Sequence, residues 1–143
     1  MSESMHVEVV SPEKVIFSGE ATMVLTRTLG VGDIAFQANH APFLGAIVEC
    51  VTKIYTTDGG VQDLAVHGGF VEVSNNRVSI LSDLAELASE IDRDRARRAM
   101  ERAEETMRQG HDAEAEAALR RAHARINAAG GVDGQSGGVR PGH

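Results

Sequence analysis

Aromatic residues are scarce in this chain of 143 residues: they make up 3% of it, and Trp is absent. A core must therefore be built from aliphatic side chains, for which the apolar fraction of 42% is ordinary. The single cysteine, Cys50, excludes an internal disulfide. The longest apolar stretch, residues 41–48, is far below the roughly 20 residues that span a bilayer. The N-terminus also lacks the basic and apolar regions of a signal peptide. We therefore expect a soluble cytoplasmic protein that reaches a membrane only through a partner.

Positive charge is also in short supply, and it is unevenly placed. Residues 1–90 hold 12 acidic and 4 basic residues, whereas residues 91–129 hold 8 acidic and 9 basic residues. An acidic domain is a poor nucleic-acid binder, because phosphate contacts need clustered cations. No nucleic-acid partner is expected.

Residues 1–88 show the pattern of an all-β domain. Alternating and β-branched segments are separated by breaks rich in glycine, among them Ser18-Gly19 and Gly68-Gly69, and no helical pattern intervenes. Asp58-Gly59-Gly60 and Asn75-Asn76 are signals for tight hairpin turns. The pattern predicts an antiparallel β-sandwich of about eight to ten short strands.

Residues 89–129 switch abruptly to helix-forming residues, which makes the whole chain α+β. A break at residues 109–112 divides two amphipathic patterns, and Asp92 (or Ser89) and Asp112 are suited to cap the two helices. This predicts an antiparallel two-helix hairpin. Its apolar stripes are mostly alanine, so we expect it to open easily. Residues 130–143 contain six glycines, and we predict a disordered tail.

The sequence shows no catalytic or metal-binding pattern. The six histidines lack the spacing of metal ligands, and no nucleophile elbow accompanies the serines. Gly30-Val31-Gly32 fits a turn better than a phosphate loop, since no third glycine and no helix follow it. Cys50 lies in an apolar segment and is expected to be a small core residue.

The arginines of the helical half allow two interpretations. In an antiparallel hairpin, Arg95 near the start of the first helix would lie close to Arg121 and Arg125 near the end of the second. Clustered guanidinium groups repel one another unless an anion lies among them, and a polyphosphate would fit. The alternative is that Glu86, Asp92 and Asp94 neutralise these arginines without a ligand.

Six segments, taken in order along residues 5–128, resemble the epsilon subunit of bacterial F-type ATP synthases, which is called delta in mitochondria. The most specific is Ile91-Asp92-Arg93-Asp94-Arg95-Ala96, which matches the family's Ile/Leu-Asp-x-x-Arg-Ala motif. The other matching segments are residues 6–13, 17–21, 40–44, 68–73 and 118–126. The chain departs from the family in two places: Ala35 replaces the second glycine of Gly-x-Leu-Gly, and Ala38-Asn39 replaces Pro-Gly. Because asparagine tolerates left-handed backbone, the second turn is expected to persist.

The resemblance implies a non-catalytic rotor subunit of the central stalk, on the cytoplasmic face of the inner membrane. The domain at residues 1–88 would contact the gamma subunit and the ring of c subunits and couple ion translocation to ATP synthesis. The helical domain at residues 89–129 would extend into the alpha and beta subunits and inhibit ATP hydrolysis.

The resemblance also implies two sets of functional residues. In some members one regulatory ATP, not a required cofactor, holds the hairpin folded; carried over, its site would comprise Glu86, Ile91, Asp92, Arg95, Arg102, Arg121 and Arg125. Asp33 and His40 would touch the rotor ring. Two alternatives remain from the residues alone: a free-standing nucleotide-sensing module, and a small hydrolase.

Overall fold

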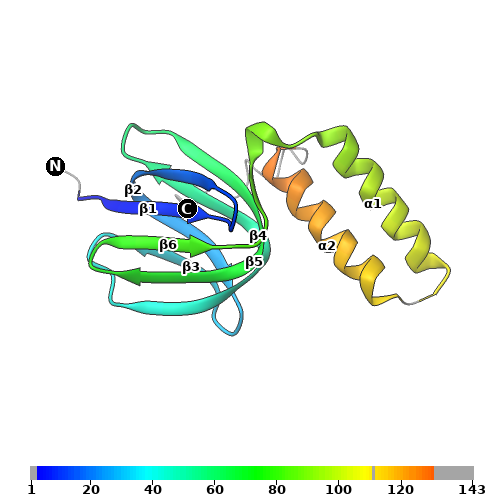
Figure 1. Cartoon of the computed structure of the whole chain (residues 1–143), viewed down its shortest axis with the longest axis horizontal. Coiled ribbons are helices and arrows are strands. Elements are labelled where there is room, and N and C mark those ends of the chain that lie inside the picture. The colour runs from blue at the N-terminus through cyan, green and yellow to red at the C-terminus, as the bar shows by residue number, and fades with distance from the viewer. Residues whose placement is uncertain (1–2, 111, 131–143) are drawn as a thin grey trace.

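The computed structural model describes residues 3–110 and 112–130. Figure 1 shows a β-rich body with a pair of helices projecting from one end. The strands are β1 (Met5–Val10), β2 (Val15–Thr28), β3 (Gly32–Gln37), β4 (Phe43–Thr56), β5 (Val61–Ser74), β6 (Arg77–Leu81) and β7 (Ala85–Leu87). A short 3-10 helix, η1 (Ala88–Glu90), leads to α1 (Arg93–Arg108) and α2 (Ala113–Ala128). The predicted α+β order, with strands first and two helices after, is confirmed.

The strands form one sheet that closes on itself. Its order is β1-β6-β5-β4-β2-β3, with β7 beside β5, and β1 also pairs with β2. All pairs are antiparallel except β1 with β6, which is parallel. Because β1 lies between β2 and β6, it joins the two halves of the sheet into a closed, sandwich-like body.

The described part of the chain has seven strands, fewer than the eight to ten short ones that the turn signals predicted. The difference arises because two predicted breaks lie inside long strands. Ser18 and Gly19 continue β2, where they pair with β1, and Gly68 and Gly69 lie within β5. Hydrogen bonding to a neighbouring strand thus overrides the local preference of glycine for turns.

Gly69 cannot carry a side chain. Its φ is +130°, and a Cβ there would lie 2.1 Å from the backbone oxygen of Leu81. Glycine therefore allows β5 to approach the backbone of Leu81 closely at the point where its pairing with β6 begins.

The core is aliphatic, as the shortage of aromatics predicted. Phe36 is the largest fully buried side chain, and the rest of the cluster is mainly valine, isoleucine and leucine. Two buried threonines satisfy each other: the Oγ1 atoms of Thr26 and Thr52 lie 2.8 Å apart. Cys50 is partly buried and packs against this core.

The predicted turns have the expected backbone. Asn75 and Asn76 both have positive φ, 49° and 58°, as a type I′ hairpin turn requires. Asn39, which stands where the family has glycine, has a φ of 68°. The left-handed turn there is kept without glycine.

The two helices form the predicted hairpin and begin at the predicted caps. The Asp92 carboxylate accepts a hydrogen bond from the Arg95 backbone N–H at 3.0 Å, and that of Asp112 accepts from Glu114 at 2.9 Å. The competing cap, Ser89, lies in η1. The buried residues of the hairpin are Ala96, Ala103, Ala115, Ala122, Ala124, Ile126 and Ala128. The predicted disordered tail, beyond Gly130, lies outside the described residues.

Candidate functional site

The hairpin meets the sandwich mainly through α2, which packs against β4 and β5. The apolar part of this junction is a small cluster in which Ala124 and Ala128 of α2 contact Ala65 of β5. Val51 and Ile91 pack at its edge. We call these five residues the alanine seam. Because its side chains are short, it buries little apolar surface and provides modest cohesion.

Glu86 lies beside the seam and connects the two domains. Its strand β7 pairs with β5, which places Glu86 opposite Ala65. One carboxylate oxygen, Oε1, accepts from Arg125 Nε at 2.7 Å and from His67 Nε2 at 3.2 Å. These hydrogen bonds, His67 first and Arg125 after it, lower the pKa of Glu86 to about 2, although partial burial opposes them. Glu86 is therefore a carboxylate across the ordinary pH range.

The other arginines of the predicted nucleotide site are placed differently. Arg121 donates to Glu114 of its own helix at 3.0 Å. Arg95 and Arg102 are exposed on α1. Arg121 and Arg125 are thus each paired with a carboxylate among the described residues. The ligand-free alternative predicted this role for Glu86, but it did not include Glu114.

The remaining two residues of that set have structural roles. Asp92 caps α1, and Ile91 packs on the alanine seam. The structure therefore brings together Glu86 and Arg125 and, through the seam, Ile91. Whether a nucleotide binds here stays a prediction.

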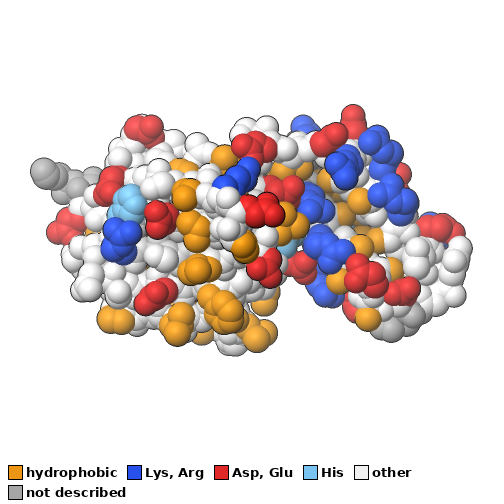
Figure 2. All heavy atoms as spheres, viewed as in Figure 1, with side chains coloured by type: hydrophobic (Ala, Val, Ile, Leu, Met, Phe, Trp, Pro, Cys, Tyr) orange, Lys and Arg blue, Asp and Glu red, His pale blue; other side chains and the backbone are white. Residues whose placement is uncertain are grey.

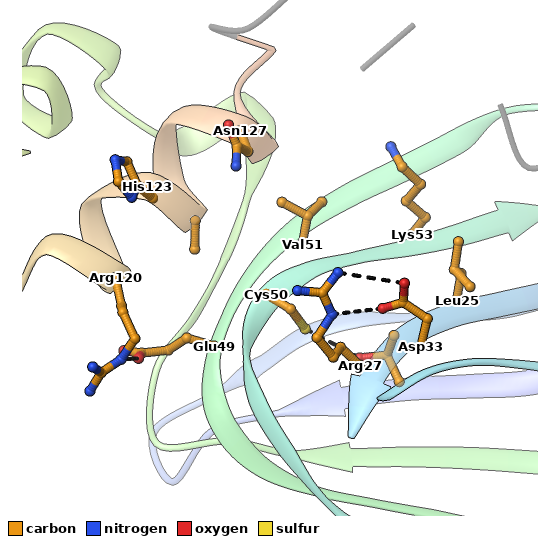
Figure 3. A pocket seen from close by; sticks show the side chains of 12 residues that line it. Leu25, Arg27, Asp33, Glu49, Cys50, Val51, Lys53, Arg120, His123 and Asn127 are labelled. Atoms are coloured by element: carbon orange, nitrogen blue, oxygen red, sulfur yellow. Dashed lines mark hydrogen bonds and ion pairs between the residues drawn. The ribbon is translucent and has the colours of Figure 1, made fainter. Parts of the chain in front are cut away.

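A cavity of about 470 Å³ adjoins the alanine seam, between α2 and the strands β2, β3 and β4, and is lined in part by Val51 and Ala124 of the seam. It contains none of the seven residues predicted for the nucleotide. Figure 3 shows two ion pairs at its margin: Arg120 Nε with Glu49 at 3.1 Å, and Arg27 Nε with Asp33 at 2.7 Å. The first connects α2 to the sandwich, and the second joins β2 to β3.

The two residues predicted to touch a rotor ring lie at opposite ends of β3. Asp33 is the second residue of this strand and is paired with Arg27. His40 follows the strand; its ring packs edge-on against Phe36 with centroids 4.9 Å apart. A shared partner would have to span the length of β3, about 20 Å at the usual strand rise.

Apolar side chains are exposed on the outer face of β4, β5 and β6. Phe70 is 58% exposed and lies opposite Leu81, which is 51% exposed; Leu44, on β4, is 72% exposed. A groove of about 310 Å³, lined in part by Val10, Phe70 and Leu81, adjoins them. We call Leu44, Phe70 and Leu81 the apolar face. Figure 2 shows hydrophobic side chains gathered on this side of the body, whereas the helices carry most of the positive charge in view.

Sequence reasoning missed three residues of the junction. They are Glu49, Arg120 and His67, and each contacts a different element of the fold. Glu49 and Arg120, which pair with each other, are 71 residues apart in the sequence. A signal was present for α2, since alanine recurs around more than one side of that helix and marks a second packed face. No comparable signal identifies the strand partners.

No group of three or more His, Cys, Asp or Glu side chains in the described part of the chain is placed to hold a metal ion. Neither α1 nor α2, nor any other helix within the described ranges, is both long and apolar enough to cross a bilayer.

Two family models together match almost the whole described chain. The model for the β-sandwich domain of the ATP synthase delta/epsilon chain matches residues 4–88, and the model for the long α-helix domain of the same chain matches residues 89–130.

Individual relatives agree with the family models. The ATP synthase epsilon chain of Streptomyces griseus is 43% identical over 128 residues, which cover 90% of this chain and 97% of the relative. That of Desulfitobacterium hafniense strain Y51 is 47% identical over 132 residues, 90% and 98% of the two chains. A chain in the structure of the Euglena gracilis mitochondrial ATP synthase (OSCP/F1/c-ring) has a TM-score of 0.76 at 20% identity. The match covers 88% of this chain and 81% of that one, and it shows the shared fold.

These matches decide against the hydrolase alternative, because both domains match the delta/epsilon chain of ATP synthase, which is a non-catalytic subunit by family identity. The chain belongs to the family of ATP synthase epsilon chains.

Proposed function

We propose that this protein is a rotor subunit of the central stalk of an F-type ATP synthase. It couples ion translocation to ATP synthesis, and its helical hairpin limits ATP hydrolysis. It acts as a peripheral protein at the cytoplasmic face of the inner membrane. The observation that carries this proposal is the combination of a closed sandwich, which bears an apolar face, with a hairpin that a small apolar seam holds against it.

The apolar face is the proposed contact with the gamma subunit. Three large side chains exposed together on one sheet face exceed what an isolated surface residue explains. The adjoining groove gives a partner side chain a place to insert. A gamma subunit that covers this face would bury Phe70 and Leu81 at the centre of the interface.

The ring of c subunits is the proposed second partner, reached through Asp33 and His40. Their separation along β3 suits a broad, shallow contact with a ring better than a single pocket. Asp33 is 65% exposed despite its ion pair with Arg27. A surface pair of this kind contributes about 0–1 kcal/mol and exchanges partners readily.

The hairpin is the proposed regulator, released from the sandwich to contact the alpha and beta subunits. The alanine seam supports this, because a switch needs two states close in energy. A regulatory ATP at Glu86, Ile91, Asp92, Arg95, Arg102, Arg121 and Arg125 remains part of the proposal. Such a ligand would have to attract Arg125 and Arg121 away from the carboxylates that now neutralise them.

The test is reconstitution of the ATP synthase with wild-type chain, Phe70→Asp or Val61→Asp. Val61 is the matched control, because it is also exposed (49%) but begins β5 far from the apolar face. We expect Phe70→Asp to weaken gamma binding by about tenfold or more, since a charge in an interface core is costly. Ion-driven ATP synthesis should fall with it, and Val61→Asp should resemble wild type. Equal gamma binding by the Phe70 variant and wild type would refute the proposed contact.

A further inference from the structure

The docked position of the hairpin depends on more than the alanine seam. Two ion pairs join α2 to the sandwich on either side of it: Arg120 with Glu49 at 3.1 Å, and Arg125 with Glu86 at 2.7 Å. The two arginines are five residues apart, which separates them by roughly 140° around an α-helix. The helix is therefore held from two sides.

The two pairs differ in their contact with water. In the first pair the Glu49 side chain is 18% exposed but the Arg120 side chain is 56% exposed, whereas both members of the second pair, Arg125 and Glu86, are largely covered, at 25% and 29% exposed. Exposed pairs contribute little because water screens them and their side chains lose freedom. Removing one member of a less exposed pair costs more, because the other charge is left poorly solvated. Arg125–Glu86 is thus the stronger connection.

His67 holds the Glu86 carboxylate in place for Arg125. The His67 side chain is 2% exposed, and its Nε2 bonds the same oxygen that accepts from Arg125. Its other ring nitrogen, Nδ1, is buried and has no partner among the described residues. A proton on Nε2 fits this arrangement, because Nε2 faces the carboxylate oxygen, whereas a proton on Nδ1 would be a buried donor without an acceptor.

We propose that Glu86, oriented by His67, is the latch that holds the hairpin docked through Arg125. When the hairpin is released, His67 keeps the carboxylate in the same orientation, so the receptor for Arg125 is already formed when the helix returns. Glu86 lies opposite Ala65 of the seam, so the ion pair and the apolar contact break in one event. The use of this latch in regulation rests on the proposed function, but the latch itself is a property of the isolated chain.

The test measures docking directly on the full chain. Spin labels are attached at Thr57→Cys on the sandwich and Glu101→Cys on α1, both exposed, in a Cys50→Ser background. The distance distribution then gives the ratio of released to docked hairpin. We expect Glu86→Gln to raise this ratio about tenfold, and Glu49→Gln, which breaks the exposed pair, by about threefold or less. Glu105→Gln is the control, because Glu105 pairs with Arg108 within α1.

A double-mutant cycle separates a latch from general loss of stability. Arg125→Gln should release the hairpin as Glu86→Gln does, and the double variant should release it no further than the more strongly released single variant. If Glu86→Gln disturbs the sandwich, Arg125→Gln on the helix surface gives the deciding ratio. The latch is refuted if neither variant differs from Glu105→Gln, or if their effects add fully.

The rate of ATP hydrolysis by the reconstituted complex distinguishes the latch itself from its proposed role in regulation. A shifted distance distribution with unchanged hydrolysis would keep the latch and reject the regulatory role of the hairpin. An unshifted distribution would reject the latch whatever the hydrolysis rate.

Discussion

Acid should weaken the docked state through Glu86, and the variant Glu86→Gln should lose this sensitivity. The pKa of Glu86 is about 2 in the folded protein against an ordinary value of 4.5. A depressed pKa means that the carboxylate stabilises the fold fully above pH 4.5. That contribution is lost as the pH falls from 4.5 toward 2, where His67 and Arg125 face a protonated acid.

The size of the effect follows from the shift in pKa. Each unit corresponds to about 1.4 kcal/mol, so the displacement sets an upper limit of about 3 kcal/mol. The Glu86 side chain is 29% exposed, and solvent screening reduces the expected contribution to about 1–2 kcal/mol.

The assay is urea unfolding of wild type and Glu86→Gln between pH 7 and pH 2.5, followed by circular dichroism of the helices. The difference in unfolding free energy between the two proteins should be largest at pH 7 and should shrink in the acid range. Glu105→Gln is the control: a hydrogen bond from Arg108 lowers the pKa of Glu105, but this pair is exposed on the helix surface. Its difference from wild type should not change measurably with pH. If the difference in unfolding free energy between wild type and Glu86→Gln is the same from pH 7 to pH 2.5, protonation of Glu86 does not affect stability and the reasoning is refuted.

Three other predictions test the fold. Gly69→Ala should lower the unfolding free energy by about 3 kcal/mol or more, because its Cβ would overlap the Leu81 backbone; Gly59→Ala, which meets no atom within 4 Å, should cost less in the same urea titration. Asp112→Ala should cost about 1 kcal/mol through loss of the α2 cap, and Asp112→Asn should restore most of it. A chain ending at residue 88 should fold alone, with a cooperative melt and strand-like circular dichroism, because the sandwich core takes no residue from the helices; a non-cooperative melt would contradict this.

The sequence predicted the strand-rich and helical halves because each depends on local pattern. Helix caps at Asp92 and Asp112 and left-handed turns at Asn75-Asn76 are set by neighbouring residues, and all are found. The number of strands was overestimated because Ser18-Gly19 has the local pattern of a break between strands. Pairing with β1 keeps these two residues inside β2. The parallel pairing of β1 with β6 joins segments some 70 residues apart, and no local pattern encodes it.

The candidate site was less predictable for the same reason. Glu86 and Arg125 were identified through resemblance to the family, and they do form an ion pair. That His67 also bonds Glu86, and that Glu49 holds Arg120, depends on which face of each strand meets α2. A shift of one residue in strand register would turn these side chains away, so their roles become visible only with the fold.

The modest strength of the junction is what suits the hairpin to regulation. Burial of one methyl-sized group contributes about 0.8 kcal/mol, so the three alanines of the seam provide roughly 2–3 kcal/mol. The Glu86–Arg125 pair adds about 1.4 kcal/mol if its loss releases the hairpin tenfold, as expected for Glu86→Gln. A ligand at 100 times its dissociation constant supplies about 2.7 kcal/mol to the state that it prefers. Docking and ligand binding are therefore of comparable size, and a bound anion or a partner subunit can shift the hairpin in either direction. A seam of leucines would exceed that range and fix the hairpin in one state.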